Sequence, residues 1–151
     1  RGWQVNGVLT LMDGSPLTVN DDSQEQADRI GSNQGLTVDL IPGGNANPVL
    51  GGAERYYDVS QFEPSKIGYF GTLGRNTLIG PGLATFDGSI FKAFLMPWSE
   101  SHKLEFRAEG FNVLNRVNLN NPVATRSNAL FGRITGAGEP RFLQLGLRYA
   151  F

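Results

Sequence analysis

The last eleven residues of the chain alternate between two kinds of side chain, and this alternation constrains the fold more than any other feature. Every second side chain lies on the same face of a strand, so an alternating run has two different faces. One phase is continuously apolar and comprises Leu143, Leu145, Leu147, Tyr149 and Phe151. The other is mostly small or polar and comprises Phe142, Gln144, Gly146, Arg148 and Ala150. Segment 141–151 is therefore predicted to be a β-strand with one apolar face.

Three earlier segments also have the length and alternation of strands. In segment 103–113, four charged residues share one phase, and this face is expected to meet water. Segment 3–11 alternates in the same way with an uncharged polar phase, whereas 83–95 alternates less clearly because Phe91 falls in its polar phase. The stretch 97–102 has the proline and serines of a turn and is predicted to join 83–95 to 103–113.

The connections between these segments alternate in length. Roughly 70 residues follow the first segment, a tight turn follows the second, and about 27 residues follow the third. Strands of about 9 to 11 residues cross a bilayer when tilted, whereas no apolar run approaches the roughly 18 residues of a transmembrane helix. The pattern predicts an all-β fold with about four C-terminal strands of an antiparallel transmembrane β-barrel and long extracellular loops, including 12–82.

The length of the chain indicates that it is part of a larger protein. A closed receptor barrel of about 22 strands needs several times 151 residues. The chain also opens at Arg1, without an initiator Met, and a strand pattern begins at Trp3. Residues 1–151 are therefore expected to be the C-terminal part of one outer-membrane barrel domain.

Composition argues against several other functions. With 13 Lys plus Arg against 14 Asp plus Glu, the chain lacks the positive field typical of nucleic-acid binding. It has no cysteine for a disulfide or thiolate metal site, and neither a metal site nor a cofactor is expected. His102 is interpreted as a solvated turn residue because it has no ligand cluster, and Asp21 and Asp22 as a solvated loop pair, with calcium a minor alternative. No catalytic residues are predicted, and the chain is not expected to be an enzyme.

Four stretches carry a family resemblance and follow one another along nearly the whole chain. They read GWQVNGVLT (2–10) with GSPLT (14–18), FGTLGRNT (70–77) with GPG (80–82), FRAEGFN (106–112) and FGRIT (131–135). These stretches resemble the C-terminal barrel segments of Oar-like TonB-dependent receptors. The resemblance implies a protein of the bacterial outer membrane that takes up an unidentified ligand actively. The TonB complex is then a partner through an N-terminal plug outside these residues.

The C-terminus resembles the signal that the barrel-assembly machinery reads. The matching positions are Gly146, Tyr149 and Phe151, while Leu145 departs from the polar residue expected before the glycine. In such signals the aromatic positions face lipid. The resemblance therefore implies that the assembly machinery and outer-membrane lipid are partners of this strand.

The polar phases supply candidates for the barrel lumen. These are Gln4, Asn6, Glu105, Arg107, Glu109, Gln144 and Arg148. A solvated face of any antiparallel sheet remains an equally good interpretation of the charged positions. The alternative for the whole chain is a soluble all-β binding or structural module, such as a carbohydrate-binding sandwich, in which the apolar phases pack two sheets together.

The charges also predict how the last two strands pair. Glu105 and Arg148 share a face only if the numbers of paired residues add to an odd value. Pairing Glu105 with Arg148 places opposite charges together, whereas a shift by two residues places Arg107 opposite Arg148. We therefore predict the first register.

Overall fold

The computed structural model describes residues 2–22 and 36–151, and for residues 99–101 it describes the backbone alone. The chain forms two compact units. The strand unit comprises Arg1–Met12, Leu83–Asn118 and Gly138–Phe151, and the loop unit comprises Asp13–Gly82 and Leu119–Ala137. Within the described residues, no helix is long and apolar enough to cross a membrane.

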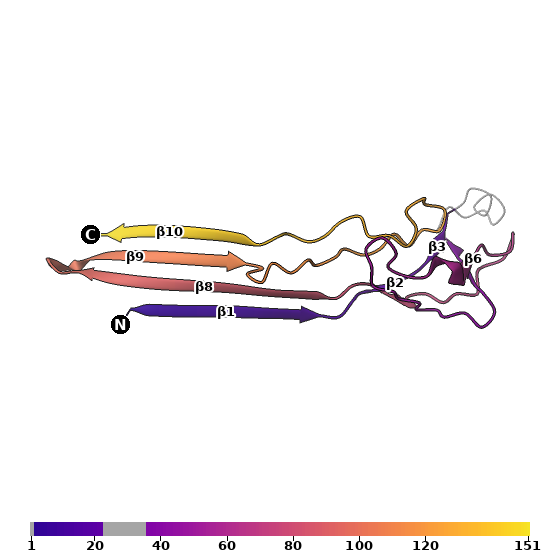
Figure 1. Cartoon of the computed structure of the whole chain (residues 1–151), viewed down its shortest axis with the longest axis horizontal. Coiled ribbons are helices and arrows are strands. Elements are labelled where there is room, and N and C mark those ends of the chain that lie inside the picture. The colour runs from indigo at the N-terminus through magenta and orange to yellow at the C-terminus, as the bar shows by residue number, and fades with distance from the viewer. Residues whose placement is uncertain (1, 23–35) are drawn as a thin grey trace. The chain divides into compact units, whose positions relative to one another are not determined.

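The strand unit is a four-stranded antiparallel sheet in which the strands lie side by side (Figure 1). The strands pair in the order β1-β8-β9-β10. Their bounds are Trp3–Met12 for β1, Leu83–Met96 for β8, Ser99–Phe111 for β9 and Phe142–Ala150 for β10. The all-β antiparallel fold predicted from the alternation is confirmed, and the sheet is open, as expected of part of a barrel.

The connection between β8 and β9 is shorter than predicted. Only Pro97 and Trp98 form the turn, and Met96 pairs with Ser99 across it. The prediction that residues 97–102 join the strands was wrong, and so was the placement of His102 in a turn. A register shift between Leu95 and Met96 accompanies the tight turn. The polar residues after Trp98 continue β9, and the next pair after Met96 and Ser99 is Leu95 with Lys103.

Asn112 ends β9 in a left-handed conformation, with φ of 48°. Its backbone N–H donates to Asp87 Oδ1 at 2.8 Å, and its side chain accepts from the Arg116 N–H at 3.1 Å. The Asn112 amide group also donates to the carbonyls of Arg116 and Glu139, at 2.9 and 3.2 Å. These bonds tie the end of β9 to β8 and to the segment that leads into β10.

In its described residues, 13–22, 36–82 and 119–137, the loop unit contains short strands and one 3-10 turn. Strand β2 (Pro16–Leu17) pairs with β7 (Leu78–Ile79), β3 (Asn20–Asp21) with β4 (Leu36–Thr37), and β5 (Asp39–Leu40) with β6 (Phe62–Glu63), while η1 covers Val59–Gln61. Residues 36–41 thus contain two separate two-residue strands. Because these strands are too short to carry the unit, side-chain packing must hold it together.

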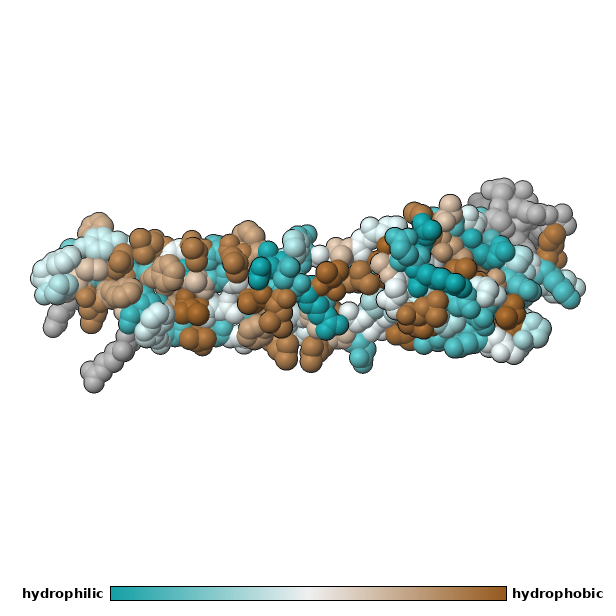
Figure 2. Space-filling model, in the orientation of Figure 1, coloured by the Kyte–Doolittle hydropathy of each residue, from teal (hydrophilic) through white to brown (hydrophobic). Residues whose placement is uncertain are grey.

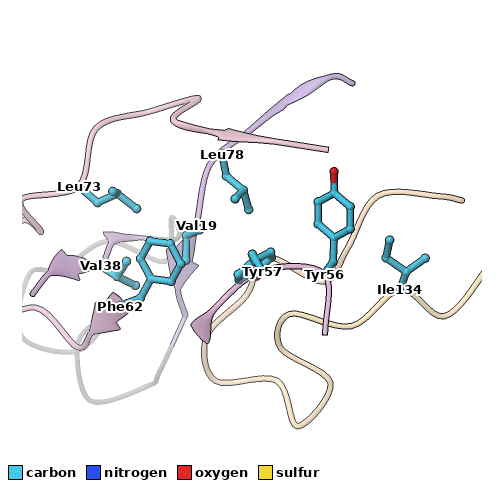
Figure 3. Close-up of a cluster of buried hydrophobic side chains, with 8 residues drawn as sticks. All are labelled: Val19, Val38, Tyr56, Tyr57, Phe62, Leu73, Leu78 and Ile134. Atoms are coloured by element: carbon cyan, nitrogen blue, oxygen red, sulfur yellow. The ribbon is translucent and has the colours of Figure 1, made fainter. Parts of the chain in front are cut away.

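A cluster of buried side chains from distant positions forms the core of the loop unit (Figure 3). Tyr57 is fully buried, and its ring meets Phe62 and Phe131 edge to face at centroid distances of 5.8 and 5.5 Å. Its hydroxyl donates to the Val123 carbonyl at 2.7 Å, and burial raises the pKa of that hydroxyl well above its ordinary value. The buried polar atom is therefore satisfied, as a stable core requires.

Polar contacts close the loops of this unit. Asn76, with φ of 56°, donates its N–H to Thr18 Oγ1 at 2.9 Å and so fixes the loop in which it lies. Asp21 lies 3.7 Å from Arg126 Nη1, and Asp22 accepts a hydrogen bond from Ser127. Asp21 is buried, so the interpretation of the two aspartates as a solvated pair was wrong for Asp21, while Asp22 is exposed.

Asp58 caps η1 at its N-terminal end. Its carboxylate accepts hydrogen bonds from the Ser60 hydroxyl at 2.9 Å and from the Arg55 guanidinium at 2.5 Å. The Ser60 hydroxyl first, and then Arg55, lower the pKa of the Asp58 carboxyl to about 2. The ionised carboxylate is therefore the form that this turn requires.

Candidate functional site on the polar face of the sheet

The strand register gives the sheet one polar and one apolar face. Residues directly opposite in an antiparallel pair share a face, so the pairing extends each phase across all four strands. We call the resulting sets the polar face and the apolar face. Chemistry-bearing residues of the polar face are Gln4, Asn6, Asp87, Ser89, Lys103, Glu105, Arg107, Glu109, Gln144 and Arg148.

The apolar face is covered by large hydrophobic side chains without a protein layer over them. Val5, Leu145 and Leu147 expose 71%, 73% and 70% of their surface. Hydrophobic residues are accordingly abundant on the surface of the strands (Figure 2). A soluble monomer rarely exposes a contiguous apolar surface of this kind, so the face must meet lipid or another protein surface.

Glu105 lies between two cations on the polar face. It pairs directly with Arg148, and the two side chains approach to 3.8 Å, which confirms the predicted register. On the same strand, Lys103 Nζ lies 2.8 Å from Glu105 Oε1. Each carboxylate oxygen therefore meets a different cation.

Arg107 combines two contacts in the middle of β9. Its guanidinium forms an ion pair with Glu109 and lies over the ring of Phe91, 4.9 Å from the ring centroid. Gly146 is directly opposite Arg107 on β10 and has no side chain to occupy the space beside it. The guanidinium is thus fixed on one side by a carboxylate and an aromatic ring.

A hollow of about 560 Å³ lies beside these charges. Most of its lining residues belong to the polar face, and two of them, Ala93 and Gly146, are small and fill little of the space. Glu105, Arg107 and Arg148 border it. The hollow presents cationic and anionic groups close together, so it suits a polar ligand or a polar protein surface better than an apolar one.

Amide and hydroxyl side chains extend the polar face toward β1. Gln4 Nε2 donates to Asn6 Oδ1 at 3.4 Å, and Asn6 Nδ2 donates to Ser89 Oγ at 3.3 Å. Glu109 lies between Ser89 on β8 and Gln144 on β10 in the pairing. All seven residues predicted for the lumen therefore lie on one face, although facing a lumen remains a prediction.

The three positions of the predicted assembly signal divide between the faces. Gly146 belongs to the polar face, whereas Tyr149 belongs to the apolar one. The Tyr149 and Phe151 rings lie 6.1 Å apart, and Phe151 is 90% exposed. The Tyr149 hydroxyl also lies 2.5 Å from Nδ1 of His102, which places that histidine in β9 beside an aromatic ring.

Sequence reasoning missed four residues of this site, among them Asp87, which lies on the polar face and accepts a hydrogen bond from the Asn112 N–H. Phe91 was noted only as an interruption of the polar phase, yet it carries the Arg107 guanidinium. Ser89 and Lys103 lay in the polar phases but were not singled out. The contact of Ser89 with Asn6 depends on the pairing of β8 with β1, whereas Lys103 lies two residues from Glu105 on the same strand. All of these residues lie in the polar phase of their strands, and that position was the signal that could have identified them.

The site is not arranged as a metal centre. Within the described part of the chain, no group of three or more histidine, aspartate or glutamate side chains could hold a metal ion. The carboxylates of Glu105 and Glu109 instead face basic side chains. The arrangement is chemically suited to reversible polar contacts along a strand surface.

Comparison with known families gives one match. A family model described as an outer membrane beta barrel domain matches residues 1–144. Searches of curated proteins and of solved structures give no significant match. The family match therefore covers all of β1, β8 and β9 and the first residues of β10.

Proposed function

Because the chain belongs to the outer membrane beta barrel domain family, we propose that its sheet is part of the wall of a TonB-dependent receptor. Family membership places the chain in the bacterial outer membrane. The finer proposal is an Oar-like receptor that takes up an unidentified ligand actively. Its role is transport, without catalysis, a cofactor or a nucleic-acid partner.

The contrast between the two faces of the sheet carries the proposal. In a barrel wall, apolar side chains face lipid and polar side chains face the interior. Leu145 and Leu147 would then contact acyl chains, while Glu105, Arg107 and Arg148 would line the lumen. A soluble sandwich explains the contrast less well, because it would need a second apolar layer over these leucines.

The connections support a specific orientation in the membrane. The β8–β9 turn contains two residues, whereas 70 residues separate β1 from β8 and 30 separate β9 from β10. Barrels of this class have short periplasmic turns and longer extracellular loops. We therefore assign Pro97–Trp98 to the periplasmic side and residues 13–82 and 112–141 to the outside.

The energy-coupled part of the proposal rests on the sequence motifs. The stretches at 2–10, 70–77, 106–112 and 131–135 resemble Oar-like receptors in content and order. The TonB complex would act on a plug elsewhere in the full-length protein. The barrel-assembly machinery would read Gly146, Tyr149 and Phe151 in β10 and at the following residue.

Single-cysteine labelling tests the proposed lumen. This chain contains no cysteine, so Gln144→Cys and Leu145→Cys can be compared in a full-length protein freed of any other thiol. A water-soluble maleimide should label Gln144→Cys in outer membranes and leave Leu145→Cys unmodified, because adjacent strand residues point to opposite faces. Equal labelling of the two positions would contradict the wall assignment.

Uptake by intact cells tests the transport proposal. Cells with and without the full-length gene would receive iron-loaded siderophores, labelled oligosaccharides and labelled peptides. At least one class should accumulate only in cells that carry the gene, and a protonophore or loss of the TonB complex should abolish that accumulation. Accumulation that persists in both treatments would contradict energy-coupled transport.

A further inference from the structure

Lys92 stands out on the apolar face. Among the strand side chains that the structure describes, it is the one lysine, arginine, aspartate or glutamate of that face. It pairs with Trp3 on β1 and with Phe106 on β9, so the register fixes its position on this side. A lysine on the lipid face of a barrel costs about 2 to 4 kcal/mol at the midplane but about 0 to 1 near an interface.

Two aromatic rings lie close to the Lys92 ammonium group. Nζ lies 5.1 Å from the ring centroid of Trp3 and 5.1 Å from that of Phe94. Aromatic girdles mark the two interfaces of a membrane barrel. Trp3 is the first residue of β1, and Phe94 precedes the two-residue turn closely. Lys92 therefore lies where phosphate groups of the lipid headgroups are found.

A hollow on the same face begins close to this lysine. Gly7, Gly88 and Gly110 lie side by side across β1, β8 and β9, and the Phe86 ring covers the first of them. Val113 and Leu143 pack close to Gly110, and beside them lies a depression of about 370 Å³ whose lining includes Val5, Ile90 and Ala108. The depression is apolar, as an acyl chain requires.

The lysine and the hollow are separated by a distance that one lipid can span. Lys92, Ile90 and Gly88 are successive residues of the apolar face on β8, and four residues of strand extend about 13 Å. The acyl chains of one leaflet extend about 15 Å, half the hydrocarbon thickness. A phosphate at Lys92 thus allows an acyl chain of the same molecule to reach Gly88.

We propose that the apolar face binds one anionic glycerophospholipid of the periplasmic leaflet, with its phosphate at Lys92 and an acyl chain in the Gly88–Gly110 hollow. This inference rests on the proposed orientation of the wall. It adds a defined lipid site to a surface that the proposed function treats as uniform. A lysine that merely reached the interface would bind no lipid preferentially.

Native mass spectrometry of the full-length protein tests the site. The protein would be reconstituted in equimolar phosphatidylethanolamine and phosphatidylglycerol, extracted in mild detergent and analysed for retained lipid. Lys92→Gln should lower phosphatidylglycerol retention about fivefold, equivalent to about 1 kcal/mol for one basic side chain at an anionic surface. Lys92→Arg should retain it. Lys103→Gln, which removes a charge from the polar face, should behave as the wild type.

A second variant tests the hollow separately from the charge. A Cβ added at Gly88 would make ordinary contacts of 3.7 Å or more, so Gly88→Leu can extend into the depression without a backbone clash. It should lower phospholipid retention while Lys92 is intact. Heat-modifiable electrophoresis would verify that each variant is folded. Retention unchanged in both Lys92→Gln and Gly88→Leu would overturn the proposal.

Two controls show whether the bound phosphate group belongs to a lipid and whether a negative result contradicts the lipid site alone or the wall assignment as well. Inorganic phosphate should not displace the lipid, and displacement by phosphate alone would overturn the lipid assignment. In the same protein, labelling of Leu145→Cys reports the orientation of the wall. A protected Leu145→Cys with unchanged lipid retention overturns only the lipid site, whereas a freely labelled one overturns the wall assignment and the lipid site together.

Discussion

Replacement of Asn112 should destabilise the strand unit through two separable effects. Asn112→Ala removes three side-chain hydrogen bonds of a residue that is only 6% exposed. At about 0.5 to 1.5 kcal/mol each, these three bonds contribute about 1.5 to 4.5 kcal/mol together. The left-handed conformation also costs alanine about 1 to 2 kcal/mol of folding free energy, because its Cβ approaches the following carbonyl oxygen.

Glycine at the same position separates the two effects. Asn112→Gly loses the same side-chain hydrogen bonds but adopts a φ of 48° without the Cβ penalty. We expect its free energy of unfolding to lie about 1 to 2 kcal/mol above that of Asn112→Ala and below that of the wild type. Asn115 is the matched control, because it has a φ of 50° but is exposed and accepts only one hydrogen bond, from the Arg141 N–H.

Urea unfolding of the full-length protein in phospholipid vesicles, followed by tryptophan fluorescence, measures these differences. Equal free energies of unfolding for Asn112→Ala and Asn112→Gly would refute the argument from backbone conformation. If both variants lay within about 0.5 kcal/mol of the wild type, as surface substitutions do, the hydrogen-bond argument would also be refuted. Asn115→Ala should cost less than Asn112→Ala in the same assay.

Three further predictions concern assembly, register and pH. Phe151→Ala should reduce the heat-modifiable folded barrel in the outer membrane with ligand affinity per folded molecule unchanged; normal folded levels with weakened binding would contradict this. Glu105→Arg should destabilise the sheet by about 0.2 to 1 kcal/mol through repulsion with Arg148, and Arg148→Glu in the same chain should restore stability, measured by urea unfolding. For Asp58, a folded-state pKa of about 2 lies below the unfolded value, so its contribution is present above about pH 4 and is lost as pH falls toward 2. Asp58→Asn should remove this pH dependence of loop-unit stability in thermal scans; an unchanged profile would contradict the assignment.

The sheet could be predicted from the sequence because alternation specifies a face for every strand residue. The phase of Leu143, Leu145 and Leu147 is apolar throughout, and that of Glu105 and Arg107 is charged, so the faces follow without tertiary information. The opposite charges of Glu105 and Arg148 then select the register. Strand ends were harder to predict, because β9 extends through polar residues to Ser99 and its register with β8 shifts near the turn.

The loop unit could not be predicted in the same way. Its core brings together Val19, Val38, Tyr57 and Leu78, which share no period and lie far apart along the chain. Two-residue strands leave no pattern in a sequence.

The hollows of the sheet were also beyond sequence reasoning, because they arise from neighbours on different strands. Gly146 was singled out as part of an assembly signal, yet its proximity to Arg107 depends on the register. Gly88 and Gly110 become adjacent only when β8 pairs with β9. The depression beside them also depends on Val113 and Leu143, which come from segments far apart in the sequence.

The faces and the charges together explain why one register is preferred in a membrane. A slip of one residue between β9 and β10 would bring Arg148 and Glu105 to opposite faces, and a charge turned toward lipid costs up to about 2 to 4 kcal/mol. A slip of two residues keeps the faces but opposes Arg107 to Arg148, which costs less than about 1 kcal/mol. The cost of turning a charge toward lipid therefore disfavours a one-residue slip far more strongly than repulsion between paired charges disfavours a two-residue slip. An apolar ring in water costs less free energy than a charge in lipid, so the polar face tolerates Phe91. For the same reason, the proposed wall places Lys92 at the membrane interface.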